Sequence, residues 1–316
     1  MKEKKKLIVI VGPTAVGKTE TSITVAKCFN GEIISGDSMQ VYKGMDIGTA
    51  KIRPDEMNGI PHHLLDIKEP EEPFSVADFQ SVVREKIDEI TARGAIPIIV
   101  GGTGLYVASV LYDYKFAAEP PDTAYRQALE KRALEGRTAE LYEELAAVDP
   151  ETARNIHPHN VKRLIRALEI YHLTGMKKSD KPKADAEPLY DTALIGLTMD
   201  RSKLYERINK RVDIMMNTGL LKEAKHFYDK GLRGVQSVQA IGYKELYEYF
   251  DGNLSLEEAV NLLKKNTRRY AKRQLTWFRN KMDVTWFDMT NEREHLNRIN
   301  EIVQFIAGKL QIKSNT

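Results

Sequence analysis

The stretch IVIVGPTAVGKTET (residues 8–21) runs an apolar, β-branched segment directly into glycines, a lysine and a threonine. Residues 12–19 fit the phosphate-loop pattern G-x-x-x-x-G-K-[ST] at every defined position, between a predicted strand and a predicted helix. In such a loop the backbone N–H groups, the helix N-terminus and the lysine all attract phosphate oxygens. We therefore predict that the loop binds a phosphate or diphosphate group through Gly12, Pro13, Thr14, Ala15, Val16, Gly17, Lys18 and Thr19.

Strand patterns alternate with helical patterns on both sides of the middle of the chain. The runs LIVIV (7–11), EIISGD (32–37) and IPIIV (96–100) are separated by helical patterns at 18–29 and 75–94. Such alternation predicts an α/β fold, a P-loop NTPase-like parallel sheet flanked by helices. TALIGLTM (192–199) resumes the strand pattern, and further helices are expected at about 201–217, 220–230, 242–251 and 255–281, before a last strand at 283–288.

Residues 116–191 have a different pattern. Proline-rich ends, AAEPPD and KKSDKPKADAEP, flank two or three helical segments, and no strand pattern lies between them. We predict an all-helical insertion domain at 116–191 within a catalytic core formed by 1–115 and 192–316. One insertion in one core is compatible with a monomer.

Composition limits the compartment and the partners. The single cysteine, Cys28, excludes an internal disulfide and suits a reducing compartment. No segment approaches the roughly 20 apolar residues of a membrane span, and the apolar run after the basic N-terminus is too short for a signal peptide. We expect a cytoplasmic protein without a membrane partner. The formal net charge is only +3, so any nucleic-acid partner must be inferred from where the charges lie.

The acidic residues near the loop are few. A protein that hydrolyses a nucleoside triphosphate normally has an acid at the end of a core strand to hold Mg²⁺, but IPIIV is followed by Gly101-Gly102-Thr103. Asp37, at the end of EIISGD, is the one core-strand acid expected to face the loop. From the residues alone it could be a Mg²⁺ ligand, a general base or a loop cap. The Thr19 hydroxyl is placed to bind Mg²⁺, which we expect as the cofactor.

Positive charge gathers in one predicted helix. Residues 255–282 contain eight lysines and arginines against two glutamates. Lys264, Arg268 and Lys272 form one row at i, i+4 and i+8, and Lys265, Arg269 and Arg273 form the adjacent row. Such a stripe favours phosphate binding along a nucleic acid. A second basic group lies in the predicted insertion: His157, His159, Lys162, Arg163 and Arg166.

Seven segments in order resemble the tRNA dimethylallyltransferase (tRNA isopentenyltransferase) family of the bacterial type. They are GPTAVGKT (12–19), ISGDSMQVYKGMDIGTAK (34–51), PHHLLDI (61–67), VGGTGLY (100–106), IHPHNVKRLIRALE (156–169), QAIGYKE (239–245) and AKRQLTWFR (271–279). The resemblance covers residues 8 to about 288. It implies transfer of a dimethylallyl group from dimethylallyl diphosphate to N6 of adenosine 37 in the tRNA anticodon loop. The loop would then hold a prenyl diphosphate, and an "ATP-binding" or nucleotide-binding label would describe the loop rather than the reaction.

The resemblance also implies roles for single residues. Asp37 would be the general base, and Arg211, from the pattern L-x-x-R-I-x-x-R at 204–211, would contact the diphosphate together with Thr19 and its Mg²⁺. The tRNA would contact Asp37, Ser38, Met39, Gln40 and Thr103 near the flipped base, Lys162, Arg163 and Arg166 in the insertion, and Lys264, Arg268, Lys272 and Arg273 in the basic helix. Some eukaryotic relatives append a zinc finger. With one cysteine, this chain is expected to bind no zinc.

Three other functions fit part of the pattern. A P-loop small-molecule or nucleoside kinase would share the phosphate loop but leaves the basic helix unexplained. An enzyme that prenylates free adenine nucleotides needs neither the insertion nor the basic stripe. A nucleotide-switched RNA-binding protein would need an acid or a switch glycine after a core strand, which IPIIVGGTG does not clearly provide.

Overall fold

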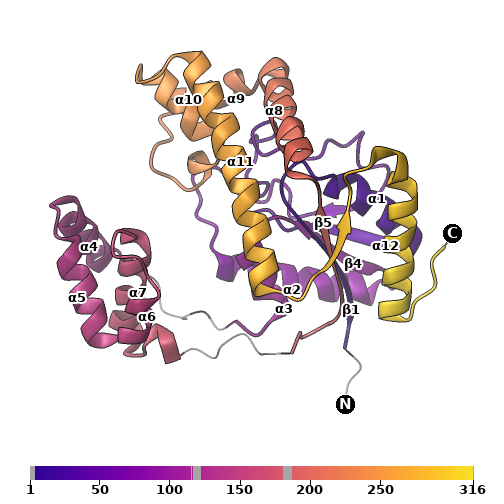
Figure 1. Ribbon diagram of the computed structural model, residues 1–316, viewed down its shortest axis with the longest axis horizontal. Helices are drawn as coiled ribbons and strands as arrows, with labels where there is room; N and C mark the ends of the chain where they lie inside the picture. Colours follow the sequence, from indigo (N-terminus) through magenta and orange to yellow (C-terminus); the bar gives the residue numbers. More distant parts are fainter. Residues whose placement is uncertain (1–3, 115, 117–121, 181–186, 316) are drawn as a thin grey trace. The chain divides into compact units, whose positions relative to one another are not determined.

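The computed structural model describes residues 4–114, 116, 122–180 and 187–315 (Figure 1). The chain divides into two compact units, one formed by Met1–Asp113 with Pro188–Thr316 and the other by Tyr114–Glu187. The second boundary lies four residues before the predicted start of the core at 192. Residues 188–191 lie with the first unit because Leu189 N–H donates to Leu111 O and Asp191 N–H donates to Lys5 O (2.8 and 2.9 Å).

The described residues of the first unit form one six-stranded sheet in the order β3-β2-β4-β1-β5-β6, with every neighbouring pair parallel. The predicted parallel α/β fold is thereby confirmed. The strands are β1 (Lys6–Val11), β2 (Gly31–Ser35), β3 (His62–His63), β4 (Ile96–Gly101), β5 (Asp191–Thr198) and β6 (Thr285–Asp288). Because β1 pairs with β4 and β5 on its two sides, its run LIVIV is buried on both faces.

The helices alternate with these strands and continue after β5. In the first unit they are α1 (Lys18–Phe29), α2 (Val76–Ala92), α3 (Gly104–Leu111), α8 (Arg201–Thr218), α9 (Leu220–Asp229), α10 (Tyr243–Phe250), α11 (Leu256–Lys281) and α12 (His295–Leu310), with short 3₁₀ turns η2 (Ser237–Gln239) and η3 (Glu292–Glu294). The bounds of the six predicted helices differ from the predicted ones by at most two residues at either end, and α3 and α12 were not predicted. Caps set several ends; Ser255 and Glu258 form a capping box that starts α11.

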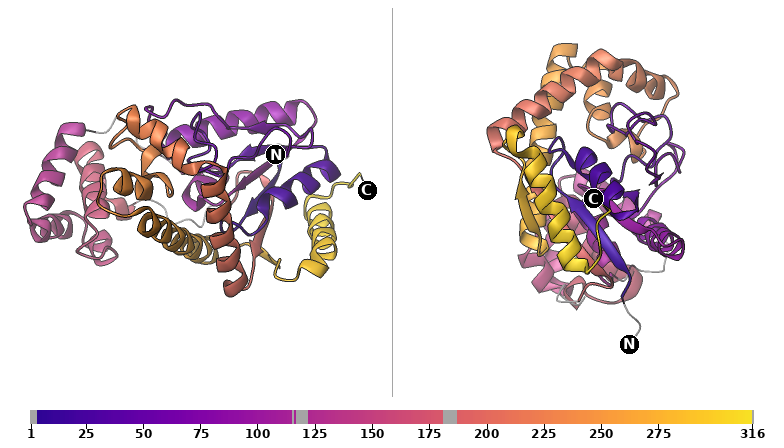
Figure 2. Two further views of the ribbon diagram at one scale, coloured as in Figure 1. Left: turned by 90° about the horizontal axis from the view of Figure 1, so that it is seen from above. Right: turned by 90° about the vertical axis from the view of Figure 1, so that its right-hand side faces the viewer.

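The direction in which the chain crosses from one strand to the next decides which face of the sheet the connecting helix covers. The chain steps from β1 past β4 to β2 through α1, continues to the edge strand β3, and then returns past β2 to β4 through α2. Right-handed crossovers in opposite directions place their helices on opposite faces, so α1 and α2 lie on different sides of the sheet (Figure 2). The side chains of Val25 on α1 and Ile302 on α12 share one apolar core with Ile10 and Ile195 of the sheet.

Two predicted strand features are corrected by the structure. The strand predicted at 32–37 ends at Ser35, because Gly36 N–H makes the last bond to β4, donating to Val100 O (2.8 Å). Asp37 therefore lies in the loop after the strand, still at its carboxyl end. The two-residue strand β3 was not predicted, since His62–His63 lacks an apolar run and owes its conformation to pairing with Ile33 and Ile34.

The second unit is helical throughout its described part. It contains α4 (Thr123–Leu134), α5 (Thr138–Val148), α6 (Pro150–Arg154), α7 (Val161–Thr174) and the 3₁₀ turn η1 (Lys178–Asp180), more helices than the two or three predicted. It has its own apolar core around Leu129, Leu141, Leu145, Leu164 and Leu168. Inside it, the buried Glu169 carboxylate accepts from the Arg126 guanidinium at 2.5 and 2.8 Å.

In the part of the chain that the structure describes, no helix is both long enough and apolar enough to cross a bilayer.

Candidate active site

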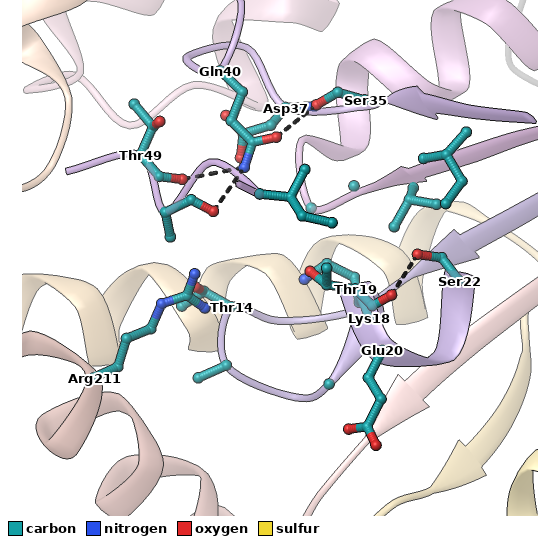
Figure 3. A pocket seen from close by; sticks show the side chains of 18 of the residues that line it. Thr14, Lys18, Thr19, Glu20, Ser22, Ser35, Asp37, Gln40, Thr49 and Arg211 are labelled. Carbon is teal, nitrogen blue, oxygen red and sulfur yellow. Dashed lines mark hydrogen bonds between the residues drawn. The ribbon is translucent and has the colours of Figure 1, made fainter. Parts of the chain in front are cut away.

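Three loops leave the carboxyl ends of neighbouring strands and meet at one edge of the sheet. The phosphate loop follows β1, the segment 36–51 follows β2, and Gly102-Thr103 follows β4. Ligands of open parallel sheets bind at this edge. The loops surround a polar cavity of about 340 Å³ that we call the phosphate cavity (Figure 3). It is lined by Thr14, Lys18, Thr19, Asp37 and Arg211, among others.

Some of the eight predicted phosphate-loop residues line the phosphate cavity, and the others are buried. Five of the eight line the phosphate cavity: Thr14, Ala15, Gly17, Lys18 and Thr19. Gly12, Pro13 and Val16 are buried and do not line it; Val16 packs into the apolar core. The Lys18 ammonium donates to Gly12 O and Pro13 O at 3.0 and 2.7 Å, which holds the charge at the mouth of the loop.

Positive charge is concentrated in this cavity. Lys18 and Arg211 both line it, and Arg207, on the same face of α8, lines it too. Burial, with a smaller contribution from Arg211, lowers the pKa of Lys18 to about 7, and burial likewise lowers the pKa of Arg211. Cations held this close in a poorly solvated site favour an anionic ligand between them. The bound anion offsets the desolvation cost of the buried cations and reduces the repulsion between them.

Asp37 is the carboxylate of the site. Its Oδ1 accepts the Met39 N–H at 2.8 Å, which aims the side chain into the cavity. Burial raises the pKa of Asp37 above its ordinary value, while the Met39 N–H and the Lys18 ammonium oppose that rise. A carboxylate whose pKa is raised is a better proton acceptor than an exposed one.

A second cavity of about 370 Å³ adjoins the first and is more apolar; we call it the apolar cavity. Thr14, Asp37, Thr49, Ala50, Arg211 and Tyr270 line both. The rest of its wall includes apolar side chains of α8 and its neighbours, Ile208, Val212, Met215, Leu220 and Leu263, and the polar residues Ser38, Thr103, Gln239 and Arg273. The two cavities therefore form one site in which Asp37 and Arg211 stand at the shared wall.

The predicted base-contacting residues are split between the two cavities. Ser38, Met39 and Thr103 line the apolar cavity. The Thr103 hydroxyl oxygen is buried, and its interaction with the Tyr270 hydroxyl opposes the rise in the pKa of Tyr270. Gln40 lines the phosphate cavity instead, where its Nε2 donates to Thr49 O and Ala50 O (3.2 and 3.3 Å) and its Oε1 accepts from the Ser35 hydroxyl (2.8 Å). Gln40 thus braces the loop as well as lining the site.

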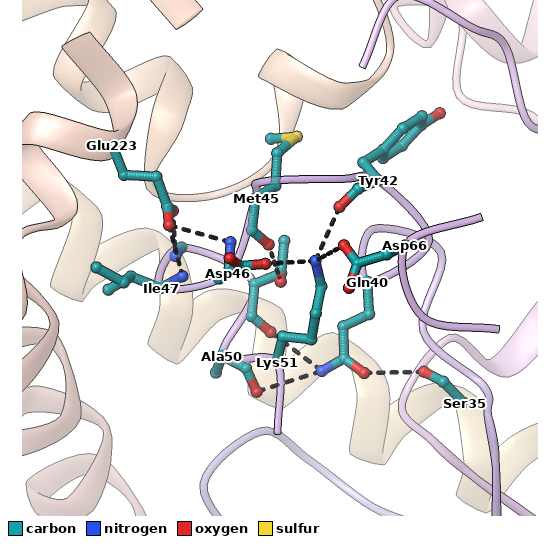
Figure 4. Close-up of polar contacts among 12 residues, drawn as sticks. Ser35, Gln40, Tyr42, Met45, Asp46, Ile47, Ala50, Lys51, Asp66 and Glu223 are labelled. Atoms are coloured by element: carbon teal, nitrogen blue, oxygen red, sulfur yellow. Dashed lines mark hydrogen bonds and ion pairs between the residues drawn. The ribbon is translucent and has the colours of Figure 1, made fainter. Parts of the chain in front are cut away.

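Two charged side chains hold the segment 42–51 in shape (Figure 4). The Lys51 ammonium bonds Tyr42 O, the Asp46 carboxylate and the Asp66 carboxylate at 2.9, 2.6 and 2.6 Å. From α9, the Glu223 carboxylate accepts the N–H groups of residues 46, 47 and 48 at 2.8–3.0 Å. Glu223 also accepts from the Tyr243 hydroxyl at 2.6 Å. These bonds fix the wall that carries Thr49 and Ala50.

The basic stripe on α11 is divided by its neighbour α8. Lys264 pairs with Asp213 at 2.5 Å, and Arg268 donates to Asn209 Oδ1 at 2.6 Å, so these two predicted tRNA-binding residues also join α11 to α8. The outward row is Lys265, Arg269 and Arg273, of which Arg273 also lines the apolar cavity, and Lys272 is exposed beside it. Sequence reasoning named Lys265 and Arg269 as basic but did not select them as candidates.

The second unit carries its own exposed basic group. Lys162, Arg163 and Arg166 lie on α7, and all three are exposed. Arg166 approaches the Glu169 carboxylate at 3.5 Å. His157 and His159 lie just before α7 and are also exposed.

Magnesium fits the donor set at the start of α1. Thr19 lines the phosphate cavity opposite Asp37, and Mg²⁺ in phosphate sites is commonly held by one or two protein oxygens with the remaining ligands from phosphate and water. No cluster of three or more metal-ligating side chains occurs among the residues that the structure describes. The Thr19 hydroxyl would hold the ion together with a diphosphate.

Among the lining residues that sequence reasoning did not select, two lie on the inner side of α11. Tyr270 lines both cavities, and Gln274 lines the phosphate cavity. Burial raises the pKa of Tyr270 to about 12, and the nearby Asp37 carboxylate adds to the rise. The two residues lie at i and i+4 on α11 and so share one face. This spacing on the inner side of the basic helix is the signal that could have identified them.

A parallel sheet with a phosphate loop at its carboxyl edge defines an α/β protein of the P-loop class. A model of the IPP transferase family matches residues 40–281, and the chain belongs to this family. Relatives named "tRNA dimethylallyltransferase" include one from Geobacillus thermodenitrificans, 60% identical over 98% of this chain and 99% of the relative, and one from Bacillus cereus, 61% identical over 99% and 98%.

Solved structures agree with these matches. A tRNA isopentenylpyrophosphate transferase from Bacillus halodurans is 56% identical, covers 98% of this chain and 97% of its own, and superposes with a TM-score of 0.75. A eukaryotic dimethylallyltransferase acting on tRNA is 31% identical, covers 99% and 81%, and has a TM-score of 0.82. The family predicted from the seven sequence segments is confirmed, and the comparisons give no support to the kinase alternative.

Proposed function

We propose that this protein transfers the dimethylallyl group of dimethylallyl diphosphate to N6 of adenosine 37 in the anticodon loop of tRNA, with release of diphosphate. One observation carries the proposal. The phosphate cavity adjoins an apolar cavity, and Asp37 and Arg211 line both. A prenyl diphosphate has the same division into an anionic end and an apolar end, whereas a nucleoside triphosphate does not.

The proposed step forms one bond and breaks one. The adenosine N6 lone pair attacks the first carbon of the dimethylallyl group, and the bond from that carbon to the diphosphate oxygen breaks with its electron pair leaving on the diphosphate. The N6 proton passes to the Asp37 carboxylate. An exocyclic amine is a weak nucleophile, so a base positioned at the shared wall would lower the barrier.

Charge on the departing diphosphate is opposed by fixed cations. Lys18, Arg211 and the N–H groups of the phosphate loop surround the cavity in which that charge would develop. Such donors are preorganised, so they stabilise the leaving group without reorganising during the reaction. When bound at Thr19, Mg²⁺ would supply a further positive charge to the diphosphate oxygens.

The tRNA would approach over the basic surfaces. To reach Asp37 the adenine must leave its stack and enter the apolar cavity, whose wall includes Ser38, Met39 and Thr103. Outward residues of α11 and the basic group on α7 would contact the phosphates of the anticodon stem and loop. A tRNA substrate is consistent with the cytoplasmic location expected from the cysteine content.

The test is a transfer assay with radiolabelled dimethylallyl diphosphate, Mg²⁺ and two unmodified transcripts of one tRNA, which differ only in adenosine or guanosine at position 37. We expect label in the adenosine transcript alone. Equal label in both would overturn the proposed acceptor. A parallel reaction with γ-labelled ATP tests the kinase alternative, which requires a labelled phosphorylated product and no prenyl transfer.

A further inference from the structure

One side chain of α11 connects two of the loops that form the phosphate cavity. Gln274 Oε1 accepts the Thr14 N–H at 2.9 Å, and Gln274 Nε2 donates to Gly102 O at 3.0 Å. Thr14 belongs to the phosphate loop after β1, and Gly102 belongs to the loop after β4. The amide thus joins two segments that are distant from it in sequence, and only 5% of the residue is exposed.

The Gln274 amide lies where a side chain at position 102 would begin. A Cβ added at Gly102 would lie 2.0 Å from Gln274 Nε2 and 3.3 Å from Gly12 O. Any side chain at this position would push the amide away from the loops. The contact therefore requires both a glycine at position 102 and a side chain as long as glutamine at position 274.

Loss of the amide would remove the hydrogen-bond partner of the buried Gly102 C=O and of the partly buried Thr14 N–H. An unsatisfied buried donor or acceptor carries its full desolvation cost, so the Thr14 N–H and the Gly102 C=O would move to find water or another partner. Such movement would change the aim of the N–H groups that follow Thr14. A site that binds an anion through backbone N–H groups depends on their being held in place beforehand.

We propose that Gln274 is a positioning residue that holds the phosphate loop in its anion-binding conformation. It would act on the diphosphate end of the donor and not on the RNA, although it lies on the helix that carries the basic stripe. Its neighbour Lys272 is exposed, whereas Gln274 is buried. The inference rests on the proposed function, because the anion in question is the donor's diphosphate.

The test replaces Gln274 by methionine, which has a similar length and no amide. Gln236→Met is the matched control: Gln236 also bonds two backbone groups, Phe74 N–H and Phe74 O (3.5 and 3.0 Å), and lines neither cavity. Three quantities are measured for each protein: the KM for dimethylallyl diphosphate in the transfer assay, the Kd of inorganic pyrophosphate with Mg²⁺ by calorimetry, and the Kd of tRNA by filter binding.

For Gln274→Met we expect the KM of the donor and the Kd of pyrophosphate to rise by about tenfold, with the tRNA Kd unchanged. Gln236→Met should match the unsubstituted protein in all three. If Gln274→Met leaves the donor KM and the pyrophosphate Kd unchanged, or if the tRNA Kd rises by the same factor, the inference is overturned. Absence of transfer by the unsubstituted protein would overturn the proposed function instead.

A second variant covers the case in which the methionine protein does not fold, as judged by its circular dichroism. Gly102→Ala places a methyl group where the Gln274 amide lies, and so breaks the same contact from the other side. We expect the same selective rise in the donor KM and the pyrophosphate Kd. Unchanged values for this variant would also overturn the inference.

Discussion

Asp37 stands at the wall between the two cavities, and its Oδ1 is aimed by the Met39 N–H. We predict that Asp37→Asn lowers kcat of prenyl transfer by about 10²–10⁴-fold, the usual contribution of a general base. The Kd of pyrophosphate should change little, because the cations of the cavity remain. Asp88→Asn, at an exposed acid paired with Lys5, is the control. Transfer at the full rate by Asp37→Asn would show that Asp37 is not the base.

Lys18 provides a prediction on proton uptake. Its pKa is lowered to about 7 in the protein, so at pH 8 much of the free protein carries a neutral amine. A bound diphosphate favours the charged ammonium and raises that pKa, and binding at pH 8 should therefore take up a proton at Lys18. Below about pH 6 the ammonium is already charged, and this uptake should disappear.

The uptake is measured by calorimetry of pyrophosphate binding in buffers that differ in ionisation enthalpy. Lys18→Arg is the comparison, because a guanidinium stays charged throughout this range. The ligand's own proton exchange is common to both proteins, so the difference between them reports Lys18. Equal uptake by both at pH 8 would contradict the prediction.

At the scale of the element, the basic residues of α11 divide into two groups, one bonded to α8 and one exposed to solvent. Lys264 and Arg268 bond to α8, whereas Lys265 and Arg269 are exposed. We predict that the double variant Lys265→Glu with Arg269→Glu weakens tRNA binding and makes it less dependent on salt. The logarithm of the affinity changes by about 0.9 per logarithm of salt for each phosphate neutralised on a duplex, so the slope should decrease by roughly one to two.

The control has the same change in net charge elsewhere on the same unit. Lys309→Glu with Lys313→Glu alters two exposed residues at the end of α12 and just after it. Filter binding across a range of salt concentrations compares the two double variants. If both reduce the affinity and the slope equally, the effect comes from net charge and the outward row of α11 has no special role.

For the whole molecule, the two units can be separated by design. The Leu189 N–H bonds Leu111 O at 2.8 Å, so the two points where the second unit leaves the core lie close together. Each unit has a separate apolar core. We predict that replacing residues 114–187 by a short glycine-serine linker leaves a folded core that binds pyrophosphate with nearly unchanged affinity. This core should bind tRNA at least about tenfold more weakly, because the deletion of α7 removes several phosphate contacts.

Thermal denaturation and calorimetry check the first part of this prediction, and filter binding checks the second. The reciprocal variant keeps the second unit but replaces Lys162 and Arg163, two exposed residues of α7, by glutamate. It should lose tRNA affinity without loss of pyrophosphate binding. If the linker protein binds tRNA as tightly as the full chain, the second unit does not contact the RNA.

Local sequence is enough to predict the parts of this protein whose chemistry is local. The phosphate loop is a contiguous pattern, the strands of a parallel sheet are continuous apolar runs, and α11 begins at its own capping box. Since the carboxyl ends of parallel strands share one edge, even the position of Asp37 near the loop follows from its place after a core strand. The functional roles of these residues remain predictions.

Tertiary structure alone decides what long-range packing brings together. The apolar cavity combines side chains of α8, α9 and α11 with the loop after β2, and no single segment reveals it. Lys264 and Lys265 are neighbours of identical chemistry, yet α8 covers one and leaves the other exposed. Nothing in the local sequence distinguishes Gln274 from any other glutamine in a helix. Only the fold places its amide against Thr14 and Gly102. The reason is physical: periodicity shows which face of a helix is buried, but only the packed neighbours determine what that face contacts.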